Sequence, residues 1–200
     1  MFGLIRHAQT IGNVEKRIQG QNDSPLTAKG VSQAKQWGHQ LKLFNWDRII
    51  VSNAGRALST AALINATLNI PLGEDAQLSE QDWGDWTGKT MAQIKKKVPR
   101  FWAEQENAGW EFCPPGGEIR SSVWERSHKA LKEAVGKWPG AKILVVTHEG
   151  VIKSLVYRLS GRQFLPTEDP LLRKNHLHWL ICPRNKLRIK DVNALALSSA

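Results

Sequence analysis

An arginine and a histidine stand side by side near the start of the chain, directly after a short apolar run. The run Leu4-Ile5-Arg6-His7-Ala8-Gln9-Thr10 predicts a buried strand that ends by placing Arg6 and His7 at its carboxyl edge. In open α/β sheets this edge is where ligands bind. A guanidinium can hold a phosphate while an imidazole nitrogen attacks its phosphorus. The pair therefore predicts phosphate chemistry.

Three further segments place polar side chains where strands end or helices begin. They carry Arg56, Glu80 and His148, and the last follows the apolar run 143–147 directly. A second arginine can share the charge of a phosphoryl group, and a carboxylic acid can protonate a leaving oxygen. Gly150 stands at the start of a predicted helix, where backbone N–H groups favour an anion. These segments extend the predicted phosphate site.

The pattern of apolar residues predicts the elements that position these side chains. Strands are expected over residues 2–5, 48–51, 143–147 and 178–181, with a further strand around Leu187 and Ile189. Helices are expected after Thr27, after Arg56, over residues 123–134 closed by Gly136, and over residues 151–159 closed by Gly161. The alternation of strands and helices favours an α/β fold, a three-layer α/β/α sandwich with a mostly parallel central sheet.

One stretch, from about residue 81 to residue 120, breaks this alternation. It holds four of the nine tryptophans, the run Lys95-Lys96-Lys97 and the turn Pro114-Pro115-Gly116-Gly117. We expect a small, partly helical cap inserted into a single domain of residues 1–200. Most of the tryptophans are expected in or near the core, and the lysine run on a solvated helix face. Residues 193–200 are small and are expected to fray.

The formal charge of +10 favours acidic partners. No nucleic-acid-binding motif accompanies it, so nucleic acid is not expected as the main partner. The alternating set Arg184, Lys186, Arg188 and Lys190 predicts a solvated strand face. No apolar run approaches about 18 residues, so no membrane partner is expected. Two distant cysteines form neither a disulfide framework nor a zinc site, and the start of the chain lacks a signal peptide, so a cytoplasmic location is expected.

Taken in order, these motifs resemble the histidine phosphatase superfamily, the phosphoglycerate mutase-like enzymes. The opening stretch 4–13 matches the family pattern Leu-x-Arg-His-Gly-Glu-Thr-x-x-Asn except at positions 8 and 9. The further matches are Arg17-Ile18-Gln19-Gly20, Asp23-Ser24-Pro25-Leu26-Thr27, Ser52 with Arg56-Ala57, Glu80 with Gly84, Pro114-Pro115-Gly116-Gly117-Glu118, and Thr147-His148-Glu149-Gly150. The resemblance covers roughly residues 1–160, and Asn175 extends it. It implies the α/β sandwich fold.

The resemblance also implies a role for each matching residue. His7 would be the nucleophile that forms a phosphohistidine. Arg6, Arg56 and His148 would bind the transferring phosphoryl group. Glu80 would protonate the leaving oxygen and then activate water. No metal and no other cofactor are expected, because the arginines supply the positive charge. Further phosphate-binding candidates are Asn13, Gln19, Gly20 and Glu149.

Three residues depart from the family pattern. Ala8 replaces a glycine beside the nucleophile, where a methyl group is expected to crowd or restrict the backbone. Glu149 replaces a glycine after His148, and its carboxylate would repel a phosphate unless it points away or meets a basic group. Gln9 replaces a glutamate, which removes one negative charge and would partly offset Glu149.

The sequence therefore predicts a metal-independent, histidine acid phosphatase-type hydrolase of small phosphorylated metabolites. Within the phosphatase branch it resembles broad-specificity and α-ribazole phosphate phosphatases. A phosphoglycerate mutase is the alternative within the family, although the chain is short after the acid motif. A non-catalytic phosphate-binding protein, suggested by Ala8 and Glu149, is the alternative outside it, and a binder needs no general acid.

The side of the pocket that receives the leaving group is expected from the cap, at residues 81–118. His176 and His178 share a strand face, but no third ligand at a suitable spacing accompanies them, so no metal site is expected. His39 and His128 are expected at the surface. The sequence leaves the physiological substrate and the oligomeric state open.

Overall fold

A computed structural model describes residues 1–198 of the chain. Within them the apolar runs assemble into a six-stranded sheet in the order β3-β2-β4-β1-β5-β6. The strands are β1 (Phe2–Arg6), β2 (Arg48–Val51), β3 (Leu72–Glu74), β4 (Ile143–Thr147), β5 (His176–Ile181) and β6 (Arg188–Ala196). The first four pair in parallel, whereas β5 is antiparallel to both β1 and β6. The sheet is therefore mostly parallel.

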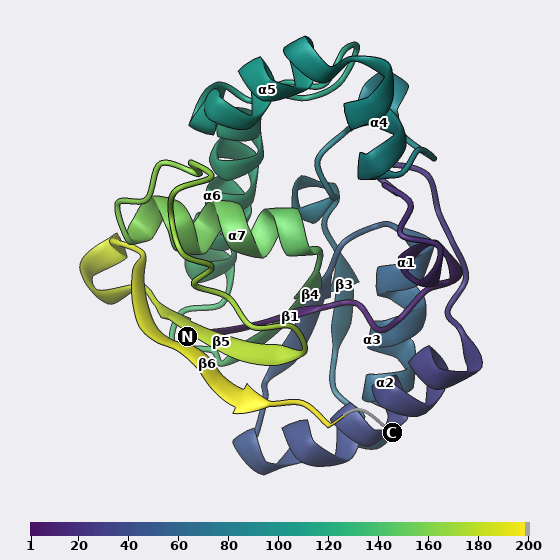
Figure 1. Ribbon diagram of the computed structural model, residues 1–200. Coiled ribbons are helices and arrows are strands. Elements are labelled where there is room, and N and C mark those ends of the chain that lie inside the picture. Colours follow the sequence, from purple (N-terminus) through teal and green to yellow (C-terminus); the bar gives the residue numbers. More distant parts are fainter. Residues whose placement is uncertain (199–200) are drawn as a thin grey trace.

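Helices cover both faces of this sheet (Figure 1). The α-helices are α1 (Ile11–Val14), α2 (Ala28–Leu41), α3 (Gly55–Leu68), α4 (Met91–Lys97), α5 (Pro99–Asn107), α6 (Arg120–Lys137) and α7 (Glu149–Leu159). Short 3-10 turns lie at Lys42–Phe44, Ala76–Leu78, Gly84–Trp86, Gly109–Glu111 and Pro183–Asn185. In β4, Val145 packs with α6 and α7, while Leu144 and Val146 pack with α2 and α3. This alternation gives the expected three-layer α/β/α sandwich.

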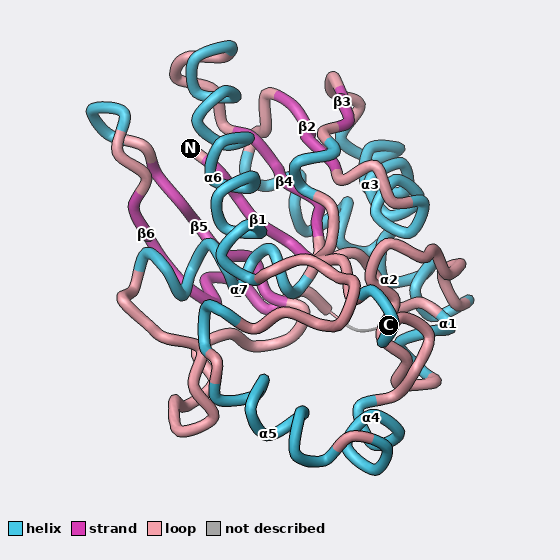
Figure 2. Tube along the Cα trace, turned by 90° about the horizontal axis from the view of Figure 1, so that it is seen from above, coloured by secondary structure: helices cyan, strands magenta, loops and turns pink. Residues whose placement is uncertain are grey.

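The segment between β3 and α6 has a small core of its own. Trp86, Ile94, Trp102 and Phe112 pack together there, separately from the two layers on the sheet. Figure 2 shows α4 and α5 well apart from the strands. Six of the nine tryptophans are buried, as expected, and the lysine run at the end of α4 is exposed. Within residues 1–198, no helix combines the length and apolarity needed to cross a membrane.

Several predicted boundaries are wrong. The sequence pattern missed β3, because this edge strand has three residues and no buried one. β5 begins two residues earlier than expected. Gly136 lies inside α6 rather than closing it, because its backbone stays helical up to Lys137. Gly161, by contrast, follows the end of α7 with φ of +73° and closes it as expected.

The C-terminal expectations need two corrections. Residues 193–196 belong to β6, where Leu195 pairs with Leu177, so they are held by the sheet. Leu197 is buried and Ser198 accepts a hydrogen bond from Trp37, while residues 199–200 lie outside the described chain. Of the four alternating basic residues, the first two lie in or beside the turn before β6. Only the last two, at positions 188 and 190, are on an exposed strand face.

Candidate active site

The carboxyl ends of the parallel strands meet around one cavity of about 320 Å³. Arg6 ends β1, His148 follows β4, and Arg56 opens α3 shortly after β2. Of the nine site residues predicted from sequence, eight line this cavity: Arg6, His7, Asn13, Gln19, Gly20, Arg56, Glu80 and Glu149. His148 is buried beside it and does not reach its wall.

His7 is held as a neutral imidazole of defined tautomer. Its Nδ1 lies 2.8 Å from the carbonyl oxygen of Ala8, which can only accept a hydrogen bond. Nδ1 therefore carries the proton, and Nε2 keeps its lone pair. Burial, followed by the positive charges of Arg6 and Arg56, lowers the pKa of His7 well below its usual value. A neutral ring with a free nitrogen is what a nucleophile requires.

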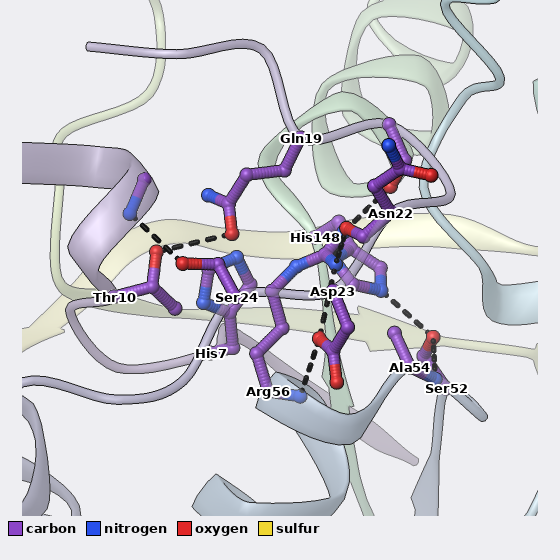
Figure 3. A network of polar contacts seen from close by, with 12 residues as sticks. His7, Thr10, Gln19, Asn22, Asp23, Ser24, Ser52, Ala54, Arg56 and His148 are labelled. Carbon is purple, nitrogen blue, oxygen red and sulfur yellow. Dashed lines mark hydrogen bonds and ion pairs between the residues drawn. The ribbon is translucent and has the colours of Figure 1, made fainter. Parts of the chain in front are cut away.

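His148 uses both of its ring nitrogens inside the protein (Figure 3). Arg56 Nη2 donates to Nδ1 over 3.2 Å, so Nε2 carries the proton and donates to Ser52 Oγ over 2.7 Å. The ring lies 5.3 Å from the His7 ring, measured between centroids. Burial, then His7 and Arg56, lowers the pKa of His148 well below its usual value. Direct contact with a phosphoryl group would require Nε2 to leave Ser52.

Arg56 is almost fully buried and is fixed from several sides (Figure 3). Its Nη1 donates to the carbonyl of Asn22 over 2.9 Å and lies 3.4 Å from Asp23 Oδ1, while Nη2 donates to the carbonyl of Gly20 over 2.8 Å. Its Nε is buried, and so is Nε of Arg6, and neither has a hydrogen-bond partner within residues 1–198. Buried donors of this kind normally have partners. The two unpaired donors suit an anionic ligand.

Glu80 lines the same cavity, and its carboxyl group is held by two backbone N–H groups. Gln81 donates to Oε1 over 2.9 Å and Gly150 donates to Oε2 over 3.3 Å. Burial nevertheless raises the pKa of Glu80 above its usual value. A Cβ at position 150 would lie 2.3 Å from Oε1, so the approach of Glu80 to the start of α7 requires glycine there.

Arg126 on α6 fixes the backbone of Glu80, a function that the sequence did not reveal. It donates to the carbonyl of Glu80 over 3.2 Å and to that of Gln77 over 2.8 Å. It also forms a paired contact of 2.7 and 2.9 Å with Glu118. The sequence pointed to one half of this contact, because Glu118 ends the Pro-Pro-Gly-Gly-Glu motif. Nothing in the sequence around it indicated that Arg126 is its partner.

The three departures from the family pattern have different outcomes. Glu149 meets a basic group, because its Oε2 lies 2.6 Å from Nη1 of Arg6. Gln9 does not line the cavity, and its Oε1 instead accepts from the Thr27 hydroxyl over 2.9 Å. The side chain of Gln9 is therefore directed to the start of α2 and not to Glu149.

Ala8, expected to crowd or restrict the backbone, fits without strain. Its methyl group packs in the core layer of α2 and α3, its φ is outside the left-handed region, and its N–H donates to Thr60 Oγ1 over 3.0 Å. An L-residue is therefore accommodated at this position.

The remaining predicted residues shape the rim of the cavity. Asn13 Oδ1 caps α1 by accepting from the backbone N–H of Thr10 over 3.1 Å. Gln19 Oε1 accepts from the Thr10 hydroxyl over 3.1 Å (Figure 3). Gly20 has φ of +50°, which favours glycine. The carbonyl oxygens of both amides are thus in use, whereas their NH₂ groups can donate to a ligand.

Sequence reasoning missed much of the outer part of the cavity. Trp83, Met91 and Arg120, which line it, come from the stretch 81–120 that was expected to form the cap. Lys153 on α7 and Phe164 in the loop after it were not expected. No local motif marks either residue, since each reaches the cavity only through the packing of distant segments.

The other histidines do not form a metal site. No cluster of three potential metal ligands occurs within residues 1–198. His178 is buried, and its Nδ1 accepts from the backbone N–H of Asn193 over 3.1 Å. His39 is exposed as expected, whereas His128 is half-buried against the ring of Trp124, at 4.6 Å between centroids.

Comparison with known proteins adds independent evidence. The family described as the histidine phosphatase superfamily (branch 1) matches residues 2–195. The chain is 32% identical to the uncharacterized phosphatase PhoE of Bacillus subtilis, over 95% of this chain and 92% of that protein. It is 33% identical to the probable phosphoglycerate mutase GpmB of Salmonella choleraesuis, over 79% of this chain and 74% of that protein.

Solved structures with this fold cover nearly the whole chain. Bacillus stearothermophilus YhfR superposes with a TM-score of 0.88 at 30% identity, over 97% of this chain and 96% of that one. A mycobacterial glucosyl-3-phosphoglycerate phosphatase, solved in complex with VO3, superposes with a TM-score of 0.81 at 28% identity. That match covers 95% of this chain and 96% of the mycobacterial chain.

Proposed function

The chain belongs to the histidine phosphatase superfamily (branch 1), and on that premise we propose that it hydrolyses small phosphomonoesters through a phosphohistidine on His7. Family membership and its phosphatase-named relatives support an enzyme with phosphatase or phosphoglycerate mutase-like activity. The observation that carries the finer proposal is the state of His7. It is a neutral ring with Nδ1 fixed on Ala8, and it lines a cavity that also contains two arginines.

The first step transfers the phosphoryl group to the protein. The Nε2 lone pair of His7 forms a bond to phosphorus while the bond between phosphorus and the ester oxygen breaks. Glu80, whose pKa is raised by burial, gives its proton to that oxygen from its protonated form, so the leaving group departs as a neutral alcohol. The proton on Nδ1 stays in its hydrogen bond to Ala8.

The second step releases phosphate and restores the site. A water molecule attacks the phosphorus while the carboxylate of Glu80 takes one of its protons. The bond between phosphorus and Nε2 breaks, inorganic phosphate leaves, and His7 regains its lone pair. Glu80 is then protonated again, so that each turnover consumes one water and one ester.

The arginines stabilise the charge of the phosphoryl group in both steps. A phosphomonoester carries a charge of about −1.5 to −2 near neutral pH. Arg6 and Arg56 each keep a buried Nε–H without a protein partner, and both line the cavity. Positive charge from these two residues makes a metal ion unnecessary in this proposal. His148 would bind the phosphoryl group if Nε2 leaves Ser52, and in the present geometry it positions Arg56.

The ligand proposed for this site is a small phosphorylated metabolite. The cavity volume of about 320 Å³ is at the lower end of small-molecule sites, which span about 300–1,000 Å³. Asn13, Gln19 and Gly20 line the same cavity and would position the phosphate from the rim. A phosphoglycerate mutase is the second candidate, supported by the mutase-named relatives. Formation of 2-phosphoglycerate from 3-phosphoglycerate, without release of phosphate, would identify it.

Hydrolysis of p-nitrophenyl phosphate tests the proposal. The wild-type protein should release nitrophenol, and the His7→Ala variant should lose at least about 10⁴-fold in kcat/KM. The exposed His39 provides a matched control, because His39→Ala should retain wild-type activity. Acid-labile phosphate bound to the wild type, and absent from His7→Ala, would report the phosphohistidine. Equal activity of His7→Ala and wild type would refute the nucleophile, and turnover of no phosphomonoester would favour a phosphate-binding protein.

A further inference from the structure

A second cavity of about 300 Å³ adjoins the first on the side away from the sheet. The two cavities share five lining residues: Trp83, Met91, Arg120, Lys153 and Phe164. This shared wall combines aromatic and apolar side chains with two cations. A ligand whose phosphoryl group lies at His7 would extend toward this wall.

The two cations of the shared wall are held against aromatic rings. The Arg120 guanidinium lies 4.3 Å from the ring centroids of both Phe112 and Phe164. Lys153 Nζ lies 5.4 Å from the ring centroid of Tyr157 and 5.8 Å from that of Phe164. Within residues 1–198, neither cation forms an ion pair. Burial lowers the pKa of Arg120 to about 10, so this guanidinium is charged at neutral pH. Burial also lowers the pKa of Lys153, and the charge of Glu149 opposes that shift.

The carboxylates near these cations are engaged elsewhere. Glu149, four residues before Lys153 on α7, lies against Arg6 instead. Glu106 lies 3.3 Å from Lys95. Glu168 accepts hydrogen bonds from the backbone N–H groups of residues 163 and 165, at 2.9 and 3.1 Å. The shared wall therefore keeps two positive charges that no neighbouring carboxylate contacts.

Phe164 is held in this wall at a conformational cost. Its φ of +62° is in the left-handed region, which a bulky L-residue rarely adopts. Ring contacts with Trp110 and Tyr157, at 4.8 and 4.6 Å between centroids, hold it there. Strain of this kind is concentrated where a side chain must be presented to a ligand.

We propose that Arg120 and Lys153 form a second anion subsite, which binds a carboxylate or phosphate on the leaving group against the aromatic wall of Trp83 and Phe164. This inference rests on the proposed function and names its substrate class. The substrates are phosphomonoesters whose leaving group has an apolar or ring-bearing body and a second oxyanion. Lys153 follows Gly150 by three residues on α7, about 4.5 Å along the helix, which places the subsite one turn from the contact with Glu80.

Three aryl phosphates that differ only at the far end of one side chain test this proposal. They are 4-(2-carboxyethyl)phenyl phosphate, its phosphonoethyl analogue and its neutral carbamoylethyl analogue. Two methylene groups separate the varied group from the ring, so the leaving oxygens are closely similar. The wild type should favour the better of the two anions over the amide by about tenfold or more in kcat/KM. The ranking of carboxylate and phosphonate identifies which oxyanion the subsite takes.

Variants at the subsite and a matched control locate the effect. Arg120→Met and Lys153→Met keep an apolar stem. Each should reduce the ratio of kcat/KM for the anionic ester to kcat/KM for the amide toward one. Lys129→Met removes an exposed lysine from the same helix as Arg120 and should keep the wild-type preference. Since Arg120 also packs between two rings, Lys153→Met provides an independent test if Arg120→Met fails to fold.

Failure of this inference is distinguishable from failure of the proposed function. Wild-type hydrolysis of all three esters at equal kcat/KM, or a preference that survives both variants, would overturn the subsite and leave the phosphatase intact. Absence of hydrolysis would overturn the phosphatase. In that case, calorimetry with the His7→Ala variant would still decide the subsite, because the anionic ester should bind about tenfold tighter than the amide. Equal dissociation constants would overturn it.

Discussion

The two ends of the cavity are built from different kinds of structure. At the phosphoryl end, Arg6, His7 and Arg56 stand at or just beyond the carboxyl ends of the buried parallel strands at the centre of the sheet. At the leaving-group end, Arg120 opens α6 and Phe164 lies in the loop after α7, so neither belongs to a strand end. Figure 2 shows the strands on one side of the molecule and α4 and α5, which belong to the cap, on the other.

This difference separates fixed chemistry from adjustable recognition. Strand ends in a packed core hold side chains within narrow limits, as phosphoryl transfer requires. Loops and cap helices tolerate substitution and set which leaving group fits. Changes at the phosphoryl end should therefore affect every substrate, whereas changes at the leaving-group end should affect only some. Substitutions at Glu80, where the two ends meet, give the sharpest test of that division.

The largest effect is expected for Glu80→Gln with alkyl phosphates. An alkoxide must be protonated as it leaves, so loss of the acid should reduce kcat/KM by about 10²–10⁴-fold. A nitrophenolate leaves without a proton and should lose far less in the first step. Rates on an alkyl and an aryl phosphate, compared with those of the exposed control Glu133→Gln, measure the difference. Equal losses on both substrates would contradict the role of general acid.

The pH profile should be set entirely by the phosphoryl end. The lowered pKa of His7 keeps the ring neutral until the solution is well acidic, so activity falls on the acid side as His7 gains a proton. The raised pKa of Glu80 keeps it protonated toward neutrality, so activity falls on the alkaline side as it loses that proton. Each limb of kcat/KM should fall about tenfold per pH unit.

Two variants check the assignment of these limbs. Glu80→Gln should abolish the alkaline limb on an alkyl phosphate, whose leaving oxygen needs the proton of Glu80, since the amide does not titrate. Arg120→Met, at the leaving-group end, should change the height of the profile and keep both limbs in place. Movement of either limb in Arg120→Met would show that the two ends of the cavity are electrostatically coupled, which would break the division between them.

The same division between the two ends of the cavity explains which site residues could be predicted from the sequence. Arg6, His7 and His148 each follow an apolar run directly, so their position at one sheet edge was predictable from the order of strands. Lys153 and Phe164 belong to no motif, and their meeting depends on how α7, its loop and the cap pack. β3 was missed for a similar reason, because a short exposed edge strand lacks an apolar run.

Which charged and polar side chains of distant segments pair with one another could also not be predicted from the sequence. Glu149 was expected either to point away or to meet a base, and only the approach of β1 to the start of α7 determined that its partner is Arg6. The bonds of His148 to Arg56 and Ser52 likewise join three separate segments. Residue type and order predicted which groups gather, and side-chain packing decided which groups touch.

A smaller effect, of opposite sign, is expected for Glu149→Gln. The carboxylate of Glu149 competes with a phosphate for Arg6, so removing its charge should lower KM. The pair is partly exposed and is worth about 0–1 kcal/mol, which limits the change to about fivefold. The change should be the same for all phosphomonoesters, because Arg6 is at the phosphoryl end. A higher KM would show instead that Glu149 positions Arg6 for binding.

The smallest effect on activity is expected for Ala8→Gly, which restores the family residue beside the nucleophile. Because Ala8 has an ordinary φ and a buried methyl group, kcat/KM should stay within about twofold of wild type. The free energy of unfolding of the variant should fall by about 1–2 kcal/mol, because a buried methyl group is lost and glycine adds backbone freedom to the unfolded chain. Urea unfolding and hydrolysis rates, measured on the same preparations, separate the two quantities. A large gain in kcat with no loss of stability would mean that the methyl group restrains His7, and that the phosphoryl end of this chain is itself adjustable.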